Sequence, residues 1–396
     1  MALTGSLVVG PDRNGRTIAI VDGIVAARAP EETPTLRCPV GEIVPGAACA
    51  HTHIYSGLVP YGMPQPAPPP ENFLEILGKV CWRLDKAIDA ESLQAAARDY
   101  VARAARRHDD ADRSSRIAQH DRRLAGNSWR SLPGARNSGG ALLWRHRAKL
   151  WSRGSDPRAS RMLQGVEAPP LLRGLIGLHA SFTVGDDPVR EAGDLARDLE
   201  TVLHVHVAED MADVMDAQAH GSAGPLERLM SLGALVPGSI LAHGVYLSAD
   251  KVRATDAHRC WFVHNPRSNE GNRVGYAHML SYSTRVALGT DGWNAAMAEE
   301  EGALARLAEQ NDDAGISGRL AGGHRLVAER FGTYPEPLAP GAIGDLVVRK
   351  DGGVCHVVVS GRLVVADGLL VNGNLDSIAE AARVQAARLW ARMATI

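Results

Sequence analysis

Short apolar runs alternate with amphipathic stretches through the middle of the chain. Several of these runs are typical of buried strands, because each is short, rich in β-branched residues and bounded by polar or turn residues. They are "GLIGLHASFTV", "VLHVHVAED", "SILAHGVYLS", "CWFVHNPRSN" and "TRVALGTDG". Amphipathic segments such as "GPLERLMSLGAL" lie between them. The repeated strand and helix order predicts a parallel sheet, and the polar residues that end each run mark the edge where a (β/α)₈ barrel carries its active site.

Both ends of the chain show a different pattern. Short apolar runs separated by glycine and proline turns, with no long helix among them, predict a small β unit. These runs are "SLVVG", "TIAIVDGIVAAR" and "GEIVPGA" near the start, and "GDLVVRK" and "CHVVVSGRLVVADGLLV" near the other end. The segment "SIAEAARVQAARLWARM" then carries apolar residues at helical spacing. We therefore expect the chain to close with a helix.

Composition narrows the class of protein. The 396 residues, 45% of them hydrophobic, are enough to bury a substantial core. A net charge of −2 gives no global electrostatic reason to expect a nucleic acid or an anionic membrane as partner, so a small molecule is expected. The five cysteines form no CxxC pair, which argues against a disulfide framework and favours a cytoplasmic location. Because no run of about 18 apolar residues and no export signal occurs, we expect no membrane span.

Histidines and acidic residues gather at the predicted strand ends. In "CAHTHIYSG", His51 and His53 are two residues apart in an extended run, so both imidazoles project from one face. Such a pair alone is more often structural than metal-binding. The segment "HVHVAED" adds either His204 or His206, which spacing alone does not distinguish, together with Glu209. The later strand ends "LAHGV" and "LGTDG" add His243 and Asp291. This ordered set predicts a metal site.

On these motifs the sequence resembles the amidohydrolase superfamily, in its aminohydrolase and chlorohydrolase (triazine hydrolase-like) branch, and most closely the SsnA-type aminohydrolases. The matching stretches cover nearly all of the chain outside the opening segment. They are "VPGAACAHTHIYSGLVPYGMP", "NFLEILGKVCWRLDKAID", "LIGLHASFTVGDD", "HVHVAED", "LAHGVYLS", "HNPRSN", "LGTDG" and "LAPGAIGDLVV". The resemblance implies a (β/α)₈ TIM-like barrel over residues 46–334. It also implies a small composite β-sandwich of residues 1–45 and 335–375, and a C-terminal helix over residues 376–396.

The resemblance also implies a metal centre. One divalent ion, zinc or alternatively iron, would be held by His51, His53, His206 and Asp291. His206 is favoured over His204 because it precedes Glu209 by three residues. A second ion is not expected, because the fourth-strand segment "GLIGLHASFTV" contains no bridging lysine.

The activity that the resemblance implies is hydrolysis of a carbon–nitrogen bond that is not a peptide bond. A metal-activated water would release ammonia, an amine or chloride from an N-heterocyclic small molecule. The catalytic residues would be Asp291, which takes the proton of the water, Glu209, which protonates the ring or leaving group, and His243, which orients the water or polarises the oxyanion. His179 would contact the substrate.

Several alternatives stay open beside this expectation. Asn265, Ser268 or Asn269 of "HNPRSN" would either bind the substrate or cap a helix. The same scaffold could hydrolyse an amide or lactam, or could be a non-catalytic metal-binding relic. A homo-oligomer is also left open.

An arginine-rich stretch interrupts the pattern where the second and third barrel strands are due. Residues 106–161 contain no Val, Thr, Phe or Tyr, and Ile117 is their only β-branched residue. A solvated insertion and a basic nucleic-acid-binding arm are two interpretations. The third is translation in a shifted frame: "RHDDADR", back-translated and read one nucleotide further on, permits Gly-Thr-Thr-Thr-Leu-Ile-Asp. We favour a compensated pair of frameshifts, and expect a barrel that lacks two native strands and a chain of impaired stability and activity.

Overall fold

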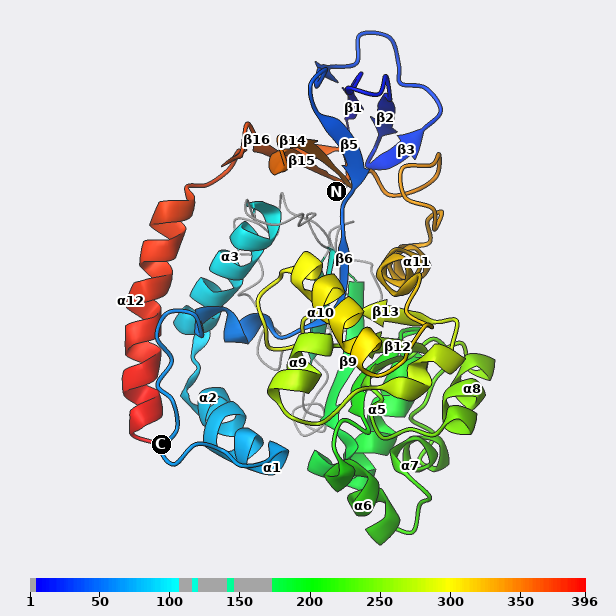
Figure 1. The fold of residues 1–396 in the computed structure, drawn as a ribbon, viewed down its shortest axis with the longest axis vertical. Coiled ribbons are helices and arrows are strands. Elements are labelled where there is room, and N and C mark those ends of the chain that lie inside the picture. Colours follow the sequence, from blue (N-terminus) through cyan, green and yellow to red (C-terminus); the bar gives the residue numbers. More distant parts are fainter. Residues whose placement is uncertain (1–4, 107–115, 120–140, 146–172) are drawn as a thin grey trace.

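The computed structural model, which describes residues 5–106, 116–119, 141–145 and 173–396, contains an eight-stranded parallel sheet in the order β6 to β13 (Figure 1). Its strands are β6 (Ala48–Thr52), β7 (Arg116–Gln119), β8 (Ala141–Arg145), β9 (Arg173–Ala180), β10 (Leu203–Val207), β11 (Ile240–His243), β12 (Trp261–His264) and β13 (Val286–Leu288). Thr52 and Asp291 form a parallel bridge that joins the first strand to the segment after the last. The sheet therefore closes into the expected (β/α)₈ barrel, and closure brings the ends of β6 and β13 together.

Helices between the strands cover the outside of the barrel. They are α5 (Asp186–Asp198), α6 (Met211–Ala219), α7 (Pro225–Ser231), α8 (Ala249–Ala257), α9 (Pro266–Gly271), η7 (His278–Tyr282), α10 (Met297–Gln310) and α11 (Arg319–Phe331). In α5 the buried residues are Val189, Ala192, Gly193 and Ala196, a spacing that places them on one helix face. Val189 and Ala196 pack with Leu175 and Val205 of the neighbouring strands. Burial of this stripe fixes the helix against the sheet.

Strands fill the second and third positions of the barrel, although the residues there have poor strand propensity; the expected loss of two native strands stays a prediction. β7 pairs with β6 and β8 pairs with β9, each in parallel, so both positions in the sheet are filled. A parallel ladder uses main-chain N–H and C=O groups that every residue except proline supplies, and neither short segment contains a proline. The rest of residues 107–172 lies outside the described residues, and the frameshift interpretation stays a prediction.

Strands from both ends of the chain form the composite β unit. One sheet has the order β3-β2-β1-β4 and the other β17-β16-β15-β14-β5. Their bounds are β1 (Ser6–Val9), β2 (Ile18–Val21), β3 (Ile24–Ala26), β4 (Thr35–Leu36), β5 (Glu42–Pro45), β14 (Leu346–Lys350), β15 (Gly353–Val359), β16 (Arg362–Ala366) and β17 (Leu369–Leu370). Ile20 and Ile43 share one buried cluster with Leu346 and Val358. The two sheets are thus held by a common core, as a small β-sandwich.

The segment after β6 forms helices that border the site. They are η1 (Ile54–Leu58), α1 (Phe73–Ile76), η2 (Leu77–Cys81), α2 (Trp82–Ala87) and α3 (Ala90–Arg106). The chain closes with α12 (Leu375–Ala394), which lies beside α3 in Figure 1. Leu93 and Ala96 of α3 share a buried cluster with Leu389 and Trp390 of α12. The terminal helix therefore packs against α3, which lines part of the site.

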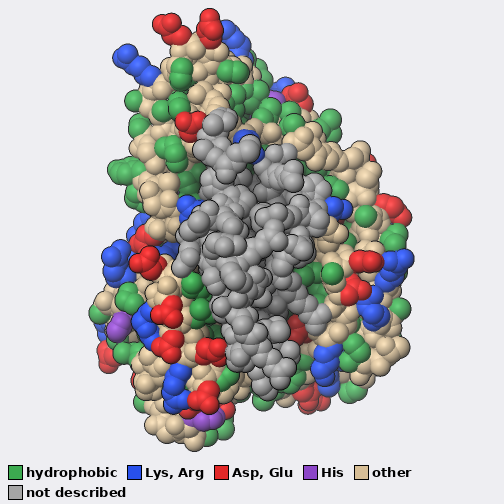
Figure 2. Space-filling model, turned by 180° about the vertical axis from the view of Figure 1, so that it is seen from behind, with side chains coloured by type: hydrophobic (Ala, Val, Ile, Leu, Met, Phe, Trp, Pro, Cys, Tyr) green, Lys and Arg blue, Asp and Glu red, His purple; other side chains and the backbone are tan. Residues whose placement is uncertain are grey.

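On the face drawn in Figure 2, acidic and basic side chains are interspersed around the region drawn in grey. All five cysteines are free thiols. Within the described part of the chain, every helix is too short or too polar to cross a membrane.

Candidate active site

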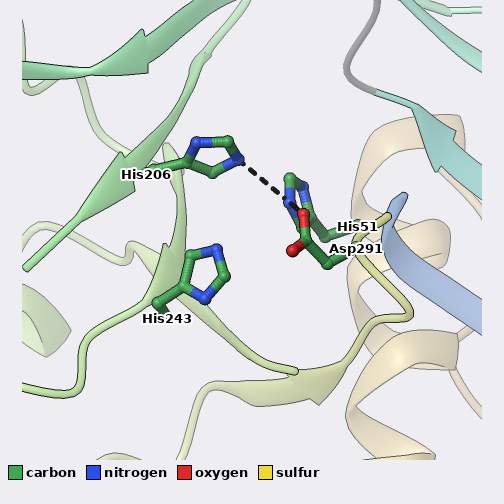
Figure 3. Close-up of side chains that lie close together, drawn as sticks. All are labelled: His51, His206, His243 and Asp291. Atoms are coloured by element: carbon green, nitrogen blue, oxygen red, sulfur yellow. Dashed lines mark hydrogen bonds and ion pairs between the residues drawn. The ribbon is translucent and has the colours of Figure 1, made fainter. Parts of the chain in front are cut away.

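Four buried side chains converge at the carboxyl ends of the barrel strands. His51 comes from β6, His206 from β10, His243 from the last position of β11, and Asp291 from the loop after β13. One ligand atom of each lies within 4.8 Å of those of the other three. In Figure 3, His206 and His243 face His51 and Asp291 across a small gap. Residues far apart in sequence therefore form one compact donor set.

The distances within this donor set fit a metal ion. His51 Nε2 lies 3.1 Å from His206 Nε2 and 3.1 Å from Asp291 Oδ1. In a tetrahedral zinc site with bonds of roughly 2.0–2.1 Å, neighbouring ligand atoms are about 3.3 Å apart. His53, expected from the sequence as a ligand, is not one of these four but lies beside them, with its Nε2 2.7 Å from Asp291 Oδ1. The imidazole and carboxylate donors are ones that zinc and iron both accept.

Burial sets the protonation states that a cation requires. It lowers the pKa of His51 to about 4, so this imidazole is neutral at neutral pH. Burial alone would raise the pKa of Asp291, but the charge of His53 and hydrogen bonds with His51 and His53 lower it well below its usual range. Metal ligands must be deprotonated to bind. A neutral His51 and an ionised Asp291 therefore fit a divalent ion.

His204 lies behind the donor set. Its Nε2 is 2.9 Å from Nδ1 of His51, on the side of that ring away from His206 and Asp291. Of the two histidines that spacing left open, His206 is the one in the cluster. A hydrogen bond to the outer nitrogen of a ligating imidazole fixes its tautomer and orientation, and His204 is placed to do this for His51.

Glu209 is a second buried carboxyl group beside the cluster. Its Oε2 lies 3.5 Å from His243 Nε2, and its Oε1 accepts a hydrogen bond of 3.2 Å from the Asn272 amide. Burial raises the pKa of Glu209 to about 7, although the charge of His243 opposes this shift. Glu209 can therefore carry a proton at neutral pH while Asp291 remains ionised, which is the division of roles that acid–base catalysis needs.

A cavity of about 920 Å³ leads to this cluster. That volume falls within the range of small-molecule sites. Its polar lining among the described residues includes His53, His179, His206, Glu209, Ser268, Asn272 and Asp291. Its apolar lining includes Val59, Met63, Phe73, Ile76, Leu77 and Val80. The cavity thus offers an apolar enclosure with convergent polar groups at one end.

The residues expected to contact substrate divide into two groups. His179 lines the cavity, and its ring packs against that of His206 with centroids 5.0 Å apart. Asn265 and Asn269 are not among the cavity-lining residues and lie behind His243 instead. Asn265 occupies the N-cap position of α9, but its side chain makes no capping hydrogen bond.

Two residues of the site were missed from the sequence. Asn272 contacts Glu209, and Trp293 lines the cavity two residues after Asp291. Asn272 follows Ser268 by four residues and Asn265 by seven, so helical spacing was the signal that could have found it. For Trp293, the only signal in the sequence was its position two residues after Asp291.

Residues 153–364 match the amidohydrolase family. The chain belongs to this family. Solved amidohydrolase-like structures share the fold across the chain: an adenosine deaminase from Xanthomonas campestris with bound zinc superposes with a TM-score of 0.79 at 19% identity, over 98% of each chain. Atrazine chlorohydrolase from Arthrobacter aurescens TC1, complexed with zinc, gives a TM-score of 0.69 at 16% identity, over 97% of this chain and 99% of that one.

Sequence similarity to curated proteins is more limited in extent. The 5-methylthioadenosine/S-adenosylhomocysteine deaminase 2 of Archaeoglobus fulgidus is 27% identical over 272 residues. The match covers 61% of this amidohydrolase and 61% of that relative. The chain therefore matches less than two thirds of this relative's length.

Proposed function

We propose that this amidohydrolase is a metal-dependent aminohydrolase of the deaminase type, which hydrolyses a carbon–nitrogen bond in a small N-heterocyclic molecule. The observation that carries the proposal is the pair of buried carboxyl groups with opposite proton preferences beside one cluster of histidines. The deaminase and chlorohydrolase names of the relatives support ammonia, an amine or chloride as the leaving group. The interspersed charge on the face drawn in Figure 2 supports a small-molecule substrate, and we propose a cytoplasmic location.

His51, His53, His206 and Asp291 would hold one divalent ion, which we propose to be zinc, with iron as the alternative. When bound, the ion would supply Lewis-acid activation of a water molecule. His243 belongs to the same buried group and has its Nε2 3.5 Å from Glu209 Oε2, where it would orient the attacking water or stabilise the developing oxyanion.

The two carboxyl groups would move the protons. Asp291, ionised and held by the Ser268 hydroxyl, would accept the proton that the water gives up as it attacks the sp² carbon. Glu209, protonated near neutral pH, would deliver its proton to the ring nitrogen or the leaving amine. Asp291 would then pass the proton it accepted to the leaving amine, and the carbon–nitrogen bond would break to release the amine. The hydroxyl left on the ring carbon would give its proton to Glu209 and become a carbonyl, so that both carboxyl groups return to their starting states. His179, at the cavity wall, would contact the ring.

Metal analysis combined with turnover tests this function. We expect the purified protein to contain a divalent ion and to release ammonia from at least one of adenosine, 5′-methylthioadenosine, guanine or an amino-triazine. Removal of the ion by a chelator should abolish turnover, and added zinc should restore it. The variant His206→Ala should bind less metal, whereas Glu227→Gln, on the surface beside Lys251, should match the wild type.

Mass spectrometry of the product separates the alternatives. Replacement of an amino group by a hydroxyl supports deamination, whereas addition of one whole water molecule to a ring shows lactam or amide hydrolysis. Bound metal without turnover on any of these substrates would identify a metal-binding relic and contradict the proposal.

A further inference from the structure

Helix α9 and the residues that cap its two ends, Asn265 and Asn272, present an inward face of polar residues to the catalytic cluster. Asn265, Ser268, Asn269 and Asn272 recur at intervals of three and four residues, so they share one helix face. Asn265, Ser268 and Asn269 are almost completely buried. Buried polar side chains need hydrogen-bond partners, so the partners of this face indicate what it does.

Three residues of this face each contact a different catalytic side chain. Asn269 Oδ1 lies 2.8 Å from His243 Nδ1. The Ser268 hydroxyl donates to Asp291 Oδ2, and the Asn272 amide donates to Glu209 Oε1 at 3.2 Å. The three catalytic residues follow or end three different strands, and α9 links all of them.

The contact with Asn269 places a proton on Nδ1 of His243. An amide oxygen can only accept a hydrogen bond, so Nδ1 donates to Asn269 across the shorter contact, while the Asn265 amide nitrogen lies 3.4 Å from the same atom. The other ring nitrogen, Nε2, lies 3.5 Å from Glu209 Oε2. His243 also has φ of +74°, in the left-handed region that residues other than glycine rarely adopt. Its ring is therefore presented from an uncommon backbone conformation.

The outer side of α9 is anchored to the loop that carries Asp291. Arg267 Nε lies 2.6 Å from Oε1 of the buried Glu300. The same guanidinium donates to the side chain and the main-chain oxygen of Asn294, at 2.7 and 2.8 Å. The helix is thus fixed on its outer side while its inward face contacts the cluster.

We propose that the inward face of α9 positions the catalytic side chains, and that Asn269 is a positioning residue that fixes the ring orientation of His243 through the proton on Nδ1. The expected effect on kcat rests on the proposed function, whereas the expected effect on the orientation of the His243 ring does not. Nothing in the geometry requires Asn265 or Asn269 to touch the substrate.

Two nearly isosteric variants test the proposal. Asn269→Asp keeps an oxygen that accepts from His243 Nδ1, and Asn269→Leu removes it. We expect Asn269→Leu to lower kcat by roughly 10- to 100-fold with KM unchanged, and Asn269→Asp to restore most of the loss. In crystal structures, the His243 ring should keep its orientation in Asn269→Asp and rotate in Asn269→Leu. Glu270→Gln is the control, because that carboxylate pairs with Arg306 on the outer surface.

The outcomes separate this proposal from the proposed function. Wild-type kcat and an unrotated His243 ring in Asn269→Leu would overturn it, as would equal losses in both variants with no change in the ring. If the wild type turns over no heterocycle, the proposed function fails, but the orientation of His243 in the two variants still decides the positioning role. If Asn269→Leu does not fold, Asn269→Ala removes the same oxygen without adding apolar volume.

Discussion

At the scale of single residues, Asp291 and Glu209 differ in the partners that surround two equally buried carboxyl groups. Asp291 is in contact with His51 and His53 and accepts from Ser268, and these contacts stabilise its charge. Glu209 accepts one amide hydrogen bond, from Asn272, so the cost of desolvation dominates and raises its pKa to about 7. The larger number of polar partners around Asp291, rather than a difference in burial, therefore supports the proposed roles of Asp291 as base and Glu209 as acid.

Replacement of Glu209 by Gln tests this assignment. Gln keeps the size of the side chain and its contact with Asn272, but it has no proton to deliver. We expect kcat to fall by about 10²- to 10⁴-fold while the metal content stays at the wild-type level. Steady-state kinetics and metal analysis on one preparation measure both quantities. Unchanged kcat would contradict the acid role, and loss of metal would show that Glu209 acts through the ion site.

At the scale of elements, α11 packs against the barrel through glycine. A Cβ added to Gly322 would lie 1.9 Å from the main-chain oxygen of Val286, in β13. The atoms that this Cβ would meet belong to the main chain of β13 and cannot rotate away. The helix would therefore have to move away from the strand to remove the clash. The position of β13 determines where Asp291 follows it, so this close approach also supports the site.

We expect Gly322→Ala to lower the free energy of unfolding by about 1–3 kcal/mol or more, through overpacking. Gly302→Ala is the matched control, because this glycine lies inside α10 and its added Cβ would meet nothing within 4 Å. The control should be stabilised by about 0.5–1 kcal/mol through helix propensity. Chemical denaturation of both variants measures the difference, and equal stabilities would show that helix and strand do not constrain each other at this position.

At the scale of the whole molecule, the strand order and the position of the site could be predicted from the sequence. Polar residues such as His206 and Asp291 end apolar runs, and parallel strands bring those ends to one edge of the sheet. Strand ends do not predict the inward face of α9, because its residues follow β12 at helical spacing. Their hydrogen-bond partners His243, Asp291 and Glu209 come from other strand ends, which only barrel closure brings near. Likewise, β7 formed where side-chain propensity argued against a strand, since pairing with β6 depends on the main chain.

The arginine-rich stretch leads to the last prediction, which concerns the stability of the whole barrel. The match with the amidohydrolase family begins at residue 153, after most of residues 106–161. Central strands of a parallel barrel are usually rich in β-branched residues, which back-translation permits in the shifted frame and which the translated frame lacks apart from Ile117. We therefore expect resequencing across the codons for Ala95 to Gly177 to reveal an insertion or deletion at each boundary, or a shifted frame that encodes family-like strands.

The protein translated from the restored frame should have a higher Tm and a larger kcat than the chain with the arginine-rich stretch, because apolar strand residues would fill the barrel interior beside β6 and β9. Thermal unfolding and turnover of the two proteins, prepared in parallel, measure this difference. The restored protein carrying Glu209→Gln is the control, since it should gain the Tm but not the activity. Stop codons in the shifted frame, or a restored protein with no higher Tm, would show that the stretch is a genuine insertion.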